Sequence, residues 1–493
     1  MKVLILIVSV VAVVSPIFAQ QRVVTDPPEV RGPFTLTAMH DSVAGHNAFA
    51  YAGKTVPPVI RVSPGGVIQL RYANNLPSQS DEECALHRCR NMSNLHFHGL
   101  HVSPERPQDD VLTMMSMPGE TLDYKVVVPV YSPPGLYWYH THPHGESARQ
   151  SFDGMSGAIV VEGIDRYYPE LRHMRERVLV LRDHDIEHSD LVARQQIMRR
   201  VEIPSSNCGT TPEQKPERVF TANGEIRPQI PINAGERQFW RIVNASPDLY
   251  ADLQLSGQQL EIVALDGMPL SYHDQHRATH KVDHVLVPPA GRVEAIVTGP
   301  PSGSRATLST RCVDTGTDGD LNPAMVIADV GSGNGEEPMR TPPSTTPPSS
   351  TGAAVYKEIS RQEIQKLEVS KPDFTVTFTE DKSGFYINGR KFSMDEDPML
   401  RVRVGSMQHW RIVNSTKEVH PFHIHQIHFL AYAENGVQSN SPDWLDTVNV
   451  PYGNGTVDLI MDFTDPIIRG MSLFHCHLLS HEDKGMMAKI LFK

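Results

Sequence analysis

The residues with the clearest chemistry lie near the C-terminus, in the stretch FHCHLLSHEDKGMM. Side chains on a β-strand point alternately to its two faces, so His475 and His477 would point one way and Cys476 the other. One short strand could then provide ligands to two metal sites at once. His481 and Met486 follow closely, and two imidazoles, a thiolate and a weak thioether form a blue-copper electron-transfer site once a further histidine is added. The motif therefore predicts a covalent path between a one-electron metal site and a second metal site.

Three further histidine clusters could supply the missing ligands. Each His-x-His pair would place two imidazoles on the same strand face, where neutral imidazole can bind a metal. With 24 histidines in the chain one such pair could arise by chance, but four clusters, one of them built around a cysteine, indicate metal sites. The histidines of the three clusters LHFHG, WYHTH and HPFHIH are His96, His98, His140, His142, His420, His423 and His425.

These four motifs resemble those of the multicopper oxidases, and the chain is similar to their three-domain, laccase-like bacterial members. The resemblance implies four copper ions per chain, one in a type 1 site and three in a trinuclear cluster. The type 1 copper would be held by His420, Cys476 and His481. Met486 would be its axial ligand, since it sits where family members carry Met, Leu or Phe, and Met487 is the competitor for this place. The resemblance assigns the type 2 copper to His96 and His423, and the type 3 pair to His98, His140, His142, His425, His475 and His477.

The same resemblance implies an oxidoreductase with dioxygen as electron acceptor. A reductant would give single electrons at the type 1 site, through the edge of His420 or His481. The thiolate of Cys476, joined through the backbone to His475 and His477, would pass them on, and four electrons would reduce dioxygen to two waters. We therefore expect Cys476 to be essential for catalysis as well as for metal binding.

Carboxylates beside the cluster are the expected proton donors. Glu482 directly follows the expected ligand His481, at a position where similar bacterial oxidases carry an acid. Asp109 follows His98 at the place of another such acid, with Asp110 as the alternative. A solvated loop carboxylate is the competing interpretation for each of them.

The reductant is less clearly indicated. Phenols and aromatic amines, as in laccases, are our first expectation, and the alternative is a metallo-oxidase acting on Cu(I), Fe(II) or Mn(II). Met114, Met115 and Met117 form a thioether-rich patch that could hold Cu(I), although three such residues are more often apolar filler. A copper-storage or carrier protein needs no His-Cys-His path. A copper nitrite reductase, with two repeats, fits less well than an oxidase with three.

Length and composition agree with an exported enzyme. Residues 1–19 carry Lys2, an apolar run and a small Ala19, which is typical of a secretory signal peptide and too short for a membrane span. We expect a periplasmic or extracellular protein, monomeric and without a membrane span in the mature chain. The net charge of −12 argues against nucleic acid as a partner. The expected partners are dioxygen and a small reductant.

Four cysteines remain after Cys476 is assigned to copper. In an exported protein they could form two disulfides in three possible pairings, and free buried thiols are the alternative. The pairing that we favour joins Cys84 to Cys89 and Cys208 to Cys312.

An internal repeat sets the number of domains. A strand-like Val or Ile, then Gly, then Arg-x-x-Asn occurs three times, with the glycines Gly65, Gly235 and Gly405 spaced 170 residues apart. Each unit predicts a strand, a Gly turn and a second strand. Asn244 and Asn414 of the repeat lie in glycosylation sequons, but their strand-like surroundings favour a buried amide. Helical periodicity is scarce, so we predict an all-β protein of three tandem β-sandwiches, which the resemblance makes cupredoxin-like Greek keys.

The motifs also divide the chain. We predict domain 1 at 20–163, domain 2 without a copper motif at 164–330, and domain 3 with the type 1 copper at 357–493. Residues 331–356 are rich in Pro, Ser, Thr and Gly, which indicates a linker or long loop. Because the expected trinuclear ligands come from the first and last domains, that cluster should lie at their interface. The middle domain should hold the outer two in register.

Overall fold

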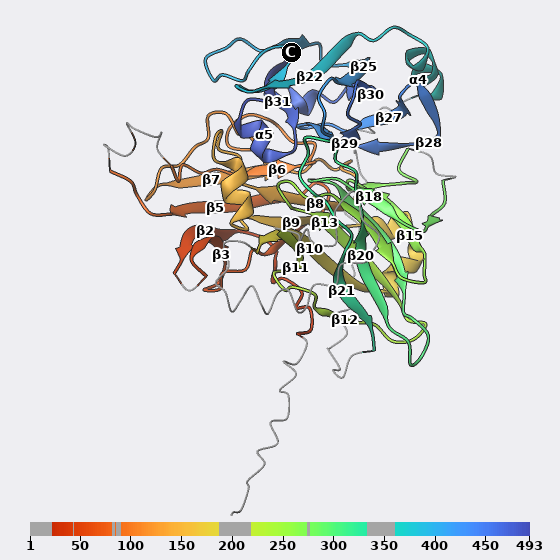
Figure 1. The fold of residues 1–493 in the computed structure, drawn as a ribbon. Coiled ribbons are helices and arrows are strands. Elements are labelled where there is room, and N and C mark those ends of the chain that lie inside the picture. Colours follow the sequence, from red (N-terminus) through yellow and green to blue (C-terminus); the bar gives the residue numbers. More distant parts are fainter. Residues whose placement is uncertain are drawn as a thin grey trace, which may run out of the picture.

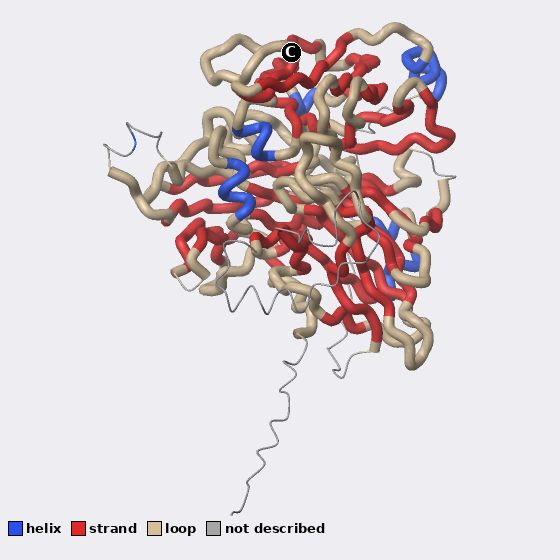
Figure 2. Tube along the Cα trace, in the orientation of Figure 1, coloured by secondary structure: helices blue, strands red, loops and turns tan. Residues whose placement is uncertain are grey.

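The computed structural model describes residues 22–42, 44–80, 84, 90–186, 218–273, 277–332 and 360–493. The expected signal peptide at 1–19 and residues 333–356 of the expected linker lie outside the described residues. No helix in the described ranges is long and apolar enough to cross a membrane. Strands dominate these ranges (Figure 2), which confirms the all-β prediction.

The described strands form six sheets, two for each of three β-sandwiches. Figure 1 shows the first (red to yellow) and middle (green) sandwiches side by side, with the last (blue) lying across them. We call them the first, middle and last sandwich. The fold agrees with the predicted three cupredoxin-like domains, while the exact domain boundaries remain predictions.

The first sandwich has two sheets that mix parallel and antiparallel strand pairs. One contains, in spatial order, β1 (Glu29–Val30), β4 (Val59–Val62), β9 (Ser156–Val161), β8 (Gly135–His140) and β6 (His96–His98). The other contains β3 (His46–Ala50), β2 (Phe34–Asp41), β5 (Val67–Asn75) and β7 (Thr121–Val127). A short helix, α2 (Ser147–Phe152), follows the second histidine cluster.

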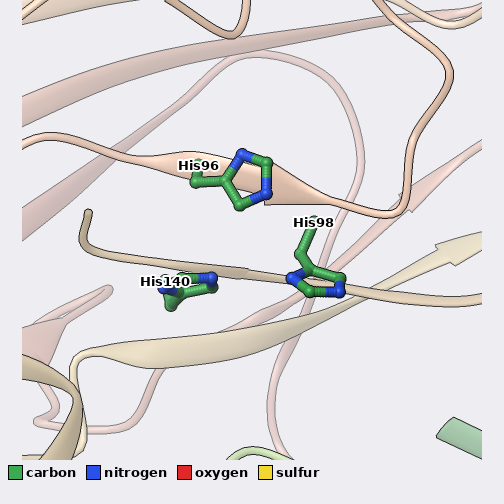
Figure 3. A group of neighbouring side chains, drawn as sticks. All are labelled: His96, His98 and His140. Atoms are coloured by element: carbon green, nitrogen blue, oxygen red, sulfur yellow. The ribbon is translucent and has the colours of Figure 1, made fainter. Parts of the chain in front are cut away.

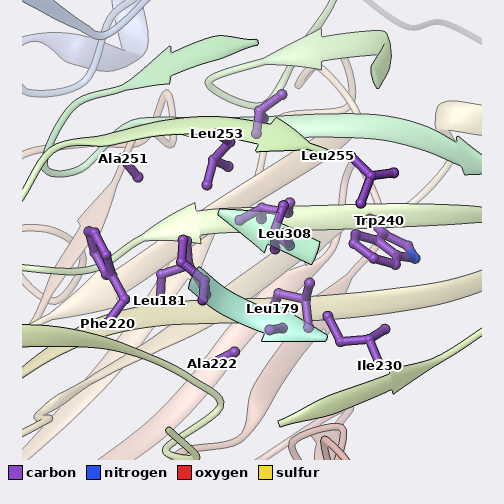
Figure 4. Close-up of a cluster of buried hydrophobic side chains, with 14 of the residues drawn as sticks. Leu179, Leu181, Phe220, Ala222, Ile230, Trp240, Ala251, Leu253, Leu255 and Leu308 are labelled. Atoms are coloured by element: carbon purple, nitrogen blue, oxygen red, sulfur yellow. The ribbon is translucent and has the colours of Figure 1, made fainter. Parts of the chain in front are cut away.

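The middle sandwich has the most extensive apolar core, built from both of its sheets (Figure 4). One sheet contains β11 (Arg218–Ala222), β10 (Arg175–Asp185), β13 (Arg237–Asn244), β19 (Arg292–Thr298), β15 (Leu260–Leu265) and β16 (Met268–Pro269), with β17 (His280–Val282) also paired to β15. The other contains β12 (Gln229–Pro231), β21 (Met325–Gly331), β20 (Ala306–Arg311), β14 (Ala251–Leu255) and β18 (Val285–Val287). Short 3-10 helices at Ile164–Arg166 and Pro169–His173 lead into it.

The last sandwich carries the His-Cys-His motif. One sheet contains β23 (Gly384–Ile387), β22 (Phe374–Asp381), β25 (Ser406–Asn414), β30 (Gly455–Phe463), β27 (Phe429–Glu434) and β28 (Val437–Leu445). The other contains β24 (Leu400–Val402), β32 (Met487–Phe492), β31 (Gly470–Cys476), β26 (His420–Ile424) and β29 (Thr447–Val450). The helices here are α4 (Arg361–Glu368), a 3-10 turn at Pro466–Ile468 and α5 (Leu479–Asp483).

The repeated glycines sit at equivalent turns of the three sandwiches. Gly65, Gly235 and Gly405 have φ values of +82°, +72° and +92°, a left-handed conformation that glycine adopts without strain. The expected strand, turn and strand are present each time. The two strands do not form a hairpin, because they belong to opposite sheets of the sandwich, so the turn crosses from one layer to the other.

Each repeat ends in an asparagine, and the structure shows the role of this side chain. Asn74, Asn244 and Asn414 are fully buried. In each case the side-chain amide donates hydrogen bonds to two backbone carbonyls, at distances of 2.8 to 3.1 Å. These bonds fasten a loop to the end of a strand, which buried carbonyl groups require. The prediction of a buried amide at Asn244 and Asn414 is confirmed.

The middle sandwich is attached to both of its neighbours. Glu294 pairs with Arg241 and accepts a hydrogen bond of 2.8 Å from the backbone N–H of Leu136 on β8. Tyr250 is buried in the core of the last sandwich, and its hydroxyl donates a hydrogen bond of 2.9 Å to the side chain of Asn449. The three sandwiches are therefore connected by specific buried contacts.

Candidate metal centres

Two pairs of strands position the candidate ligands. In the first sandwich β6 pairs antiparallel with β8, which sets His96 opposite His140. In the last sandwich β26 pairs antiparallel with β31, which sets His423 opposite His475. Because side chains alternate along a strand, His98 on β6 points to the same face as His96. The other second histidines follow within two residues of their strand ends, and they are His142, His425 and His477. Figure 3 shows His96 and His98 on β6 with His140 beside them.

The two histidine groups meet across the interface of the first and last sandwiches. The rings of His96 and His425 stack with centroids 3.8 Å apart, and those of His98 and His423 stack at 3.9 Å. His142 Nε2 lies 3.4 Å from His475 Nε2. All eight histidines that the resemblance assigns to the trinuclear cluster are at most 2% exposed. The structure therefore brings the expected ligands together at the expected interface.

The donor atoms of this cluster fit a metal. Several buried ring nitrogens have no hydrogen-bond partner among the described residues, which is costly for a polar atom that binds nothing. Burial, together with neighbouring imidazoles, lowers the pKa of these histidines well below its usual value, so the metal-binding neutral form prevails. The unpartnered nitrogens are His96 Nε2, His98 Nδ1, His140 Nε2, His423 Nε2, His425 Nδ1 and both ring nitrogens of His477.

A second group fits a mononuclear site. His420 Nδ1 lies 3.3 Å from Cys476 Sγ and 3.3 Å from His481 Nδ1. Cys476 is a free, fully buried cysteine. Burial raises the pKa of its thiol well above the usual value, so a metal cation is needed to hold it as a thiolate. Two imidazoles and one thiolate are the equatorial donors of a blue-copper site.

The two adjacent methionines lie in different surroundings. Met486 is buried in the same core as Cys476, and its backbone carbonyl accepts a hydrogen bond of 3.0 Å from the Cys476 N–H. Met487 pairs in register with His475 and packs against Val111 on the other side of the strand. This placement favours Met486 as the axial ligand.

Both expected proton donors are buried beside the histidines. Glu482 Oε2 lies 3.1 Å from His475 Nδ1, and Glu482 Oε1 lies 3.6 Å from His142 Nδ1. The carboxylate oxygens of Asp109 lie 3.0 and 3.1 Å from His96 Nδ1. Burial raises the pKa of both carboxyl groups well above the usual value, so each favours its protonated form more than an exposed carboxyl group does.

Asp110, the alternative to Asp109, has a different position. Its carboxylate accepts hydrogen bonds from the backbone N–H groups of Leu112 and Thr113, at 3.1 and 2.8 Å. It therefore stabilises a turn, and the structure favours Asp109 as the acid beside the cluster.

The site contains residues that the sequence did not reveal. Asp446 Oδ1 lies 3.1 Å from His98 Nε2, and the backbone carbonyl of Asp446 lies 2.8 Å from His423 Nδ1. Arg292 of the middle sandwich donates to both carboxylate oxygens of Asp446, at 2.8 and 2.5 Å. The middle sandwich therefore contributes a charged group to the cluster as well as holding its neighbours. Neither residue is near a histidine motif in the sequence, so no local signal marks them.

Glu418 is a further residue that the motifs did not indicate. Its Oε1 lies 3.5 Å from His481 Nε2. Its carboxyl group also feels the negative charges of Glu380, Asp320 and Asp318, so this edge of the candidate mononuclear site is acidic.

Some described cysteines and methionines outside the motifs have structural roles. Cys84 and Cys312 are disulfide-bonded, so the free-thiol alternative is wrong for these two. Cys89 and Cys208 lie outside the described residues, and the pairing remains a prediction. Met114 is buried in the core of the first sandwich, which favours apolar filler over a Cu(I) patch.

A three-sandwich fold with a His-Cys-His strand between two buried donor clusters defines a copper-dependent oxidoreductase. Two multicopper oxidase family models match residues 35–165 and 362–493, together more than half of the chain. The chain belongs to the multicopper oxidase family, whose members use copper and dioxygen.

Individual relatives are distant but cover most of the chain. A Staphylococcus aureus multicopper oxidase is 23% identical over 90% of this chain and 83% of its own, and a Bacillus subtilis laccase is 22% identical over 91% of each. A solved multicopper oxidase of Campylobacter jejuni, described as a metallo-oxidase, has a TM-score of 0.68, 21% identity and 96% coverage of both chains. The McoA structure from Aquifex aeolicus has a TM-score of 0.69, 18% identity and 96% and 99% coverage. These structures share the fold.

Proposed function

We propose that this multicopper oxidase is laccase-like and takes electrons from phenols or aromatic amines at the edge of His481. The observation that carries the proposal is the accessibility of this ring. His481 is 8% exposed, whereas the other candidate ligands are at most 2% exposed. Of the two expected entry points His420 and His481, only the second reaches the surface.

The surroundings of His481 suit such a substrate. The ring of Phe385 stacks on that of His481 with centroids 3.9 Å apart, which adds an aromatic surface. The carboxyl group of Glu418 faces His481 Nε2 and can hydrogen-bond a phenolic hydroxyl or an amine N–H. A substrate bound there loses one electron and one proton at the same place.

We further propose the following assignment of copper ligands. His420, Cys476, His481 and Met486 would hold the type 1 copper. When bound, the coppers take up electrons one at a time and deliver four of them to dioxygen, which becomes two waters. The remaining candidate ligands are His96 and His423 for the type 2 copper, and His98, His140, His142, His425, His475 and His477 for the type 3 pair.

The chain's own residues then provide the path, the protons and the dry environment. Cys476 is bonded through the backbone to His475 and His477, so the two sites share one continuous strand. Glu482 and Asp109 hold protons at oxygen atoms that contact His475 and His96. Burial of all these groups excludes bulk water from the cluster.

One observation favours a second candidate, a metallo-oxidase that oxidises Cu(I), Fe(II) or Mn(II). Glu418, which lies beside His481, has Glu380, Asp318 and Asp320 near its own carboxyl group, and such a group of acids attracts metal cations. A carboxylate ligand also favours the oxidised state of these metals, because it stabilises the higher charge.

The test compares dioxygen uptake with a methoxyphenol, an aromatic diamine and each of the three metal ions. The proposal expects phenol turnover with one dioxygen consumed per four phenols, and a loss of kcat/KM in Glu418→Gln. Glu225→Gln, an acid on the middle sandwich paired with Arg22, is the matched control. If dioxygen is consumed with a metal ion as reductant but not with the organic reductants, the laccase-like proposal is overturned in favour of the metallo-oxidase. If the protein binds copper but consumes no dioxygen with any of these reductants, the result would support a copper-storage protein.

We also propose that the mature chain is exported and monomeric. The signal-like sequence at 1–19 and the disulfides at Cys84 and Cys312 support an oxidising compartment. Mass spectrometry of the secreted chain should find an N-terminus near Gln20, and light scattering should give the mass of one chain. An intact N-terminus in the cytoplasm would contradict export.

A further inference from the structure

A narrow pocket lies where the three sandwiches meet, separate from the edge of His481. It has about 10 Å³ of space for solvent, close to what one water molecule needs. Its walls are mainly aromatic and imidazole rings, with one carboxylate. The lining residues are His101, Tyr131, Pro133, Met268, Tyr272, His273, His428, Trp444 and Asp462.

Two of these residues form a closely hydrogen-bonded histidine pair. His101 Nε2 lies 2.6 Å from His428 Nδ1. His428 Nε2 lies 2.7 Å from the backbone carbonyl of Asp266. A carbonyl only accepts, so His428 Nε2 carries the proton and His428 Nδ1 is the acceptor. His101 Nε2 is then the donor, which leaves Nδ1 of this pocket-lining residue as a basic nitrogen.

The pair continues inward to the candidate cluster. His428 Nε2 lies 3.6 Å from Asp446 Oδ2, and Asp446 Oδ1 lies 3.1 Å from His98 Nε2. Arg292 holds the carboxylate of Asp446 from the other side. A row of polar groups therefore connects the pocket to the interface of the first and last sandwiches. Neither expected proton donor belongs to it, because Glu482 contacts His142 and His475 and Asp109 contacts His96.

We propose that His101 and His428 relay protons from this pocket toward the trinuclear cluster. The inference rests on the reduction of dioxygen, which consumes four protons with four electrons to give two waters. An N–H bond forms at His101 Nδ1 while the one at Nε2 breaks, and the same exchange follows on His428 from Nδ1 to Nε2. The proton then passes alongside Asp446 and is consumed in water formation. Both imidazoles end neutral with the N–H at Nδ1, and each returns to the Nε2–H tautomer before the next proton enters. The electrons come from the reductant.

The electrostatics of the pair suit transit rather than storage. Asp446 and Asp465 favour a proton on the pair, whereas Arg292 and His273 oppose it, and Asp462 also lines the pocket. Burial outweighs the carboxylates and lowers the pKa of His101 to about 3 and that of His428 to about 4. Both rings are therefore neutral at rest, and each can accept a proton at one nitrogen while it releases one from the other.

The test isolates the proton-consuming half of the reaction. The copper-loaded protein is fully reduced with dithionite, and its reoxidation by dioxygen is followed by stopped flow from pH 5 to 9, in H₂O and in D₂O. In His101→Gln the amide can still donate to His428 Nδ1 but cannot exchange a proton. His428→Gln breaks the relay at its second step. His280→Gln, on exposed β17 of the middle sandwich, is the control.

We expect His101→Gln to keep its copper content and type 1 potential, and to reoxidise about tenfold more slowly at pH 8. This is less than the roughly 10²–10⁴-fold of full general acid catalysis, because Glu482 and Asp109 remain. The defect should grow with pH, the solvent isotope effect should rise, and the control should behave as wild type. Wild-type reoxidation by His101→Gln at every pH, with an unchanged isotope effect, would overturn the proposal. Loss of copper from His101→Gln would also overturn it, by showing a structural role. Because dithionite replaces the natural reductant, neither result depends on the laccase-like proposal.

Discussion

Replacing Arg292 should destabilise the protein more than any exposed arginine would. Arg292 and Asp446 are both fully buried, and the guanidinium donates to both carboxylate oxygens at 2.8 and 2.5 Å. Arg292→Met leaves the carboxylate of Asp446 buried without its counter-charge. Removing one partner of a buried ion pair costs about 3–5 kcal/mol. In a unit the size of one sandwich, each kcal/mol lost from the free energy of unfolding lowers the thermal unfolding midpoint by roughly 2–4 °C. The midpoint should therefore fall by roughly 10 °C.

The pH dependence of the stability of Arg292→Met distinguishes an unpaired charge on Asp446 from a simple packing defect. In the wild type, burial raises the pKa of Asp446, but the charge and hydrogen bonds of Arg292 outweigh burial, so the net shift is downward. In Arg292→Met the pKa rises, because burial acts without the arginine. The variant should therefore recover stability as the pH falls and Asp446 takes up a proton.

Differential scanning fluorimetry from pH 5 to 8 measures both effects. Arg292→Met/Asp446→Asn should recover part of the loss, since the second change removes the unpaired charge. Arg71→Met is the control, because Arg71 pairs with Asp123 on the surface and should leave the midpoint unchanged. An Arg292→Met midpoint equal to that of the wild type at pH 8 would refute the reasoning.

Three further changes test other parts of the structure. Burial, followed by the charge of Asp248, raises the pKa of Asp183 to about 7. As the pH rises from 4 to 7 this carboxyl group ionises first in the unfolded chain, so the free energy of unfolding of the wild type should fall by up to about 4 kcal/mol. Asp183→Asn should remove this loss in pH-dependent urea unfolding, and an unchanged profile would contradict the assigned pKa. Met486→Leu should raise the type 1 reduction potential, because a thioether stabilises Cu(II), and an unchanged potential in redox titration would exclude the axial role. Glu482→Gln should lose turnover while keeping its blue absorption, and normal dioxygen uptake would exclude proton donation.

The candidate ligands could be predicted from the sequence because each set is local. A strand that alternates side chains places His475 and His477 on one face and Cys476 on the other, whatever the rest of the fold does. The repeat predicted the number of sandwiches for the same reason. It did not predict that the strands around Gly65 lie in opposite sheets, because strand partners are chosen by packing of distant segments.

The groups that surround the ligands could not be predicted because their contacts are long-range. His98 and Asp446 are 348 positions apart in the chain, and Arg292 and Asp446 are 154 apart. An arginine or aspartate in a strand-like segment is usually exposed, and only the assembled sandwiches bury these two. The pairing of His101 with His428 likewise depends on the first and last sandwiches meeting. Local sequence patterns thus identify the candidate metal ligands, whereas tertiary packing determines which charged and hydrogen-bonding groups surround these ligands.

The most direct measurement is the copper content, absorption spectrum and dioxygen uptake of Cys476→Ser beside the wild type. The wild type should bind four coppers, with an intense thiolate-to-copper band. The variant should lose that band and one copper, keep the other three at the buried histidines, and take up no dioxygen with any reductant. A variant that oxidises substrate at the wild-type rate would contradict the claim that this sulfur joins the two metal centres.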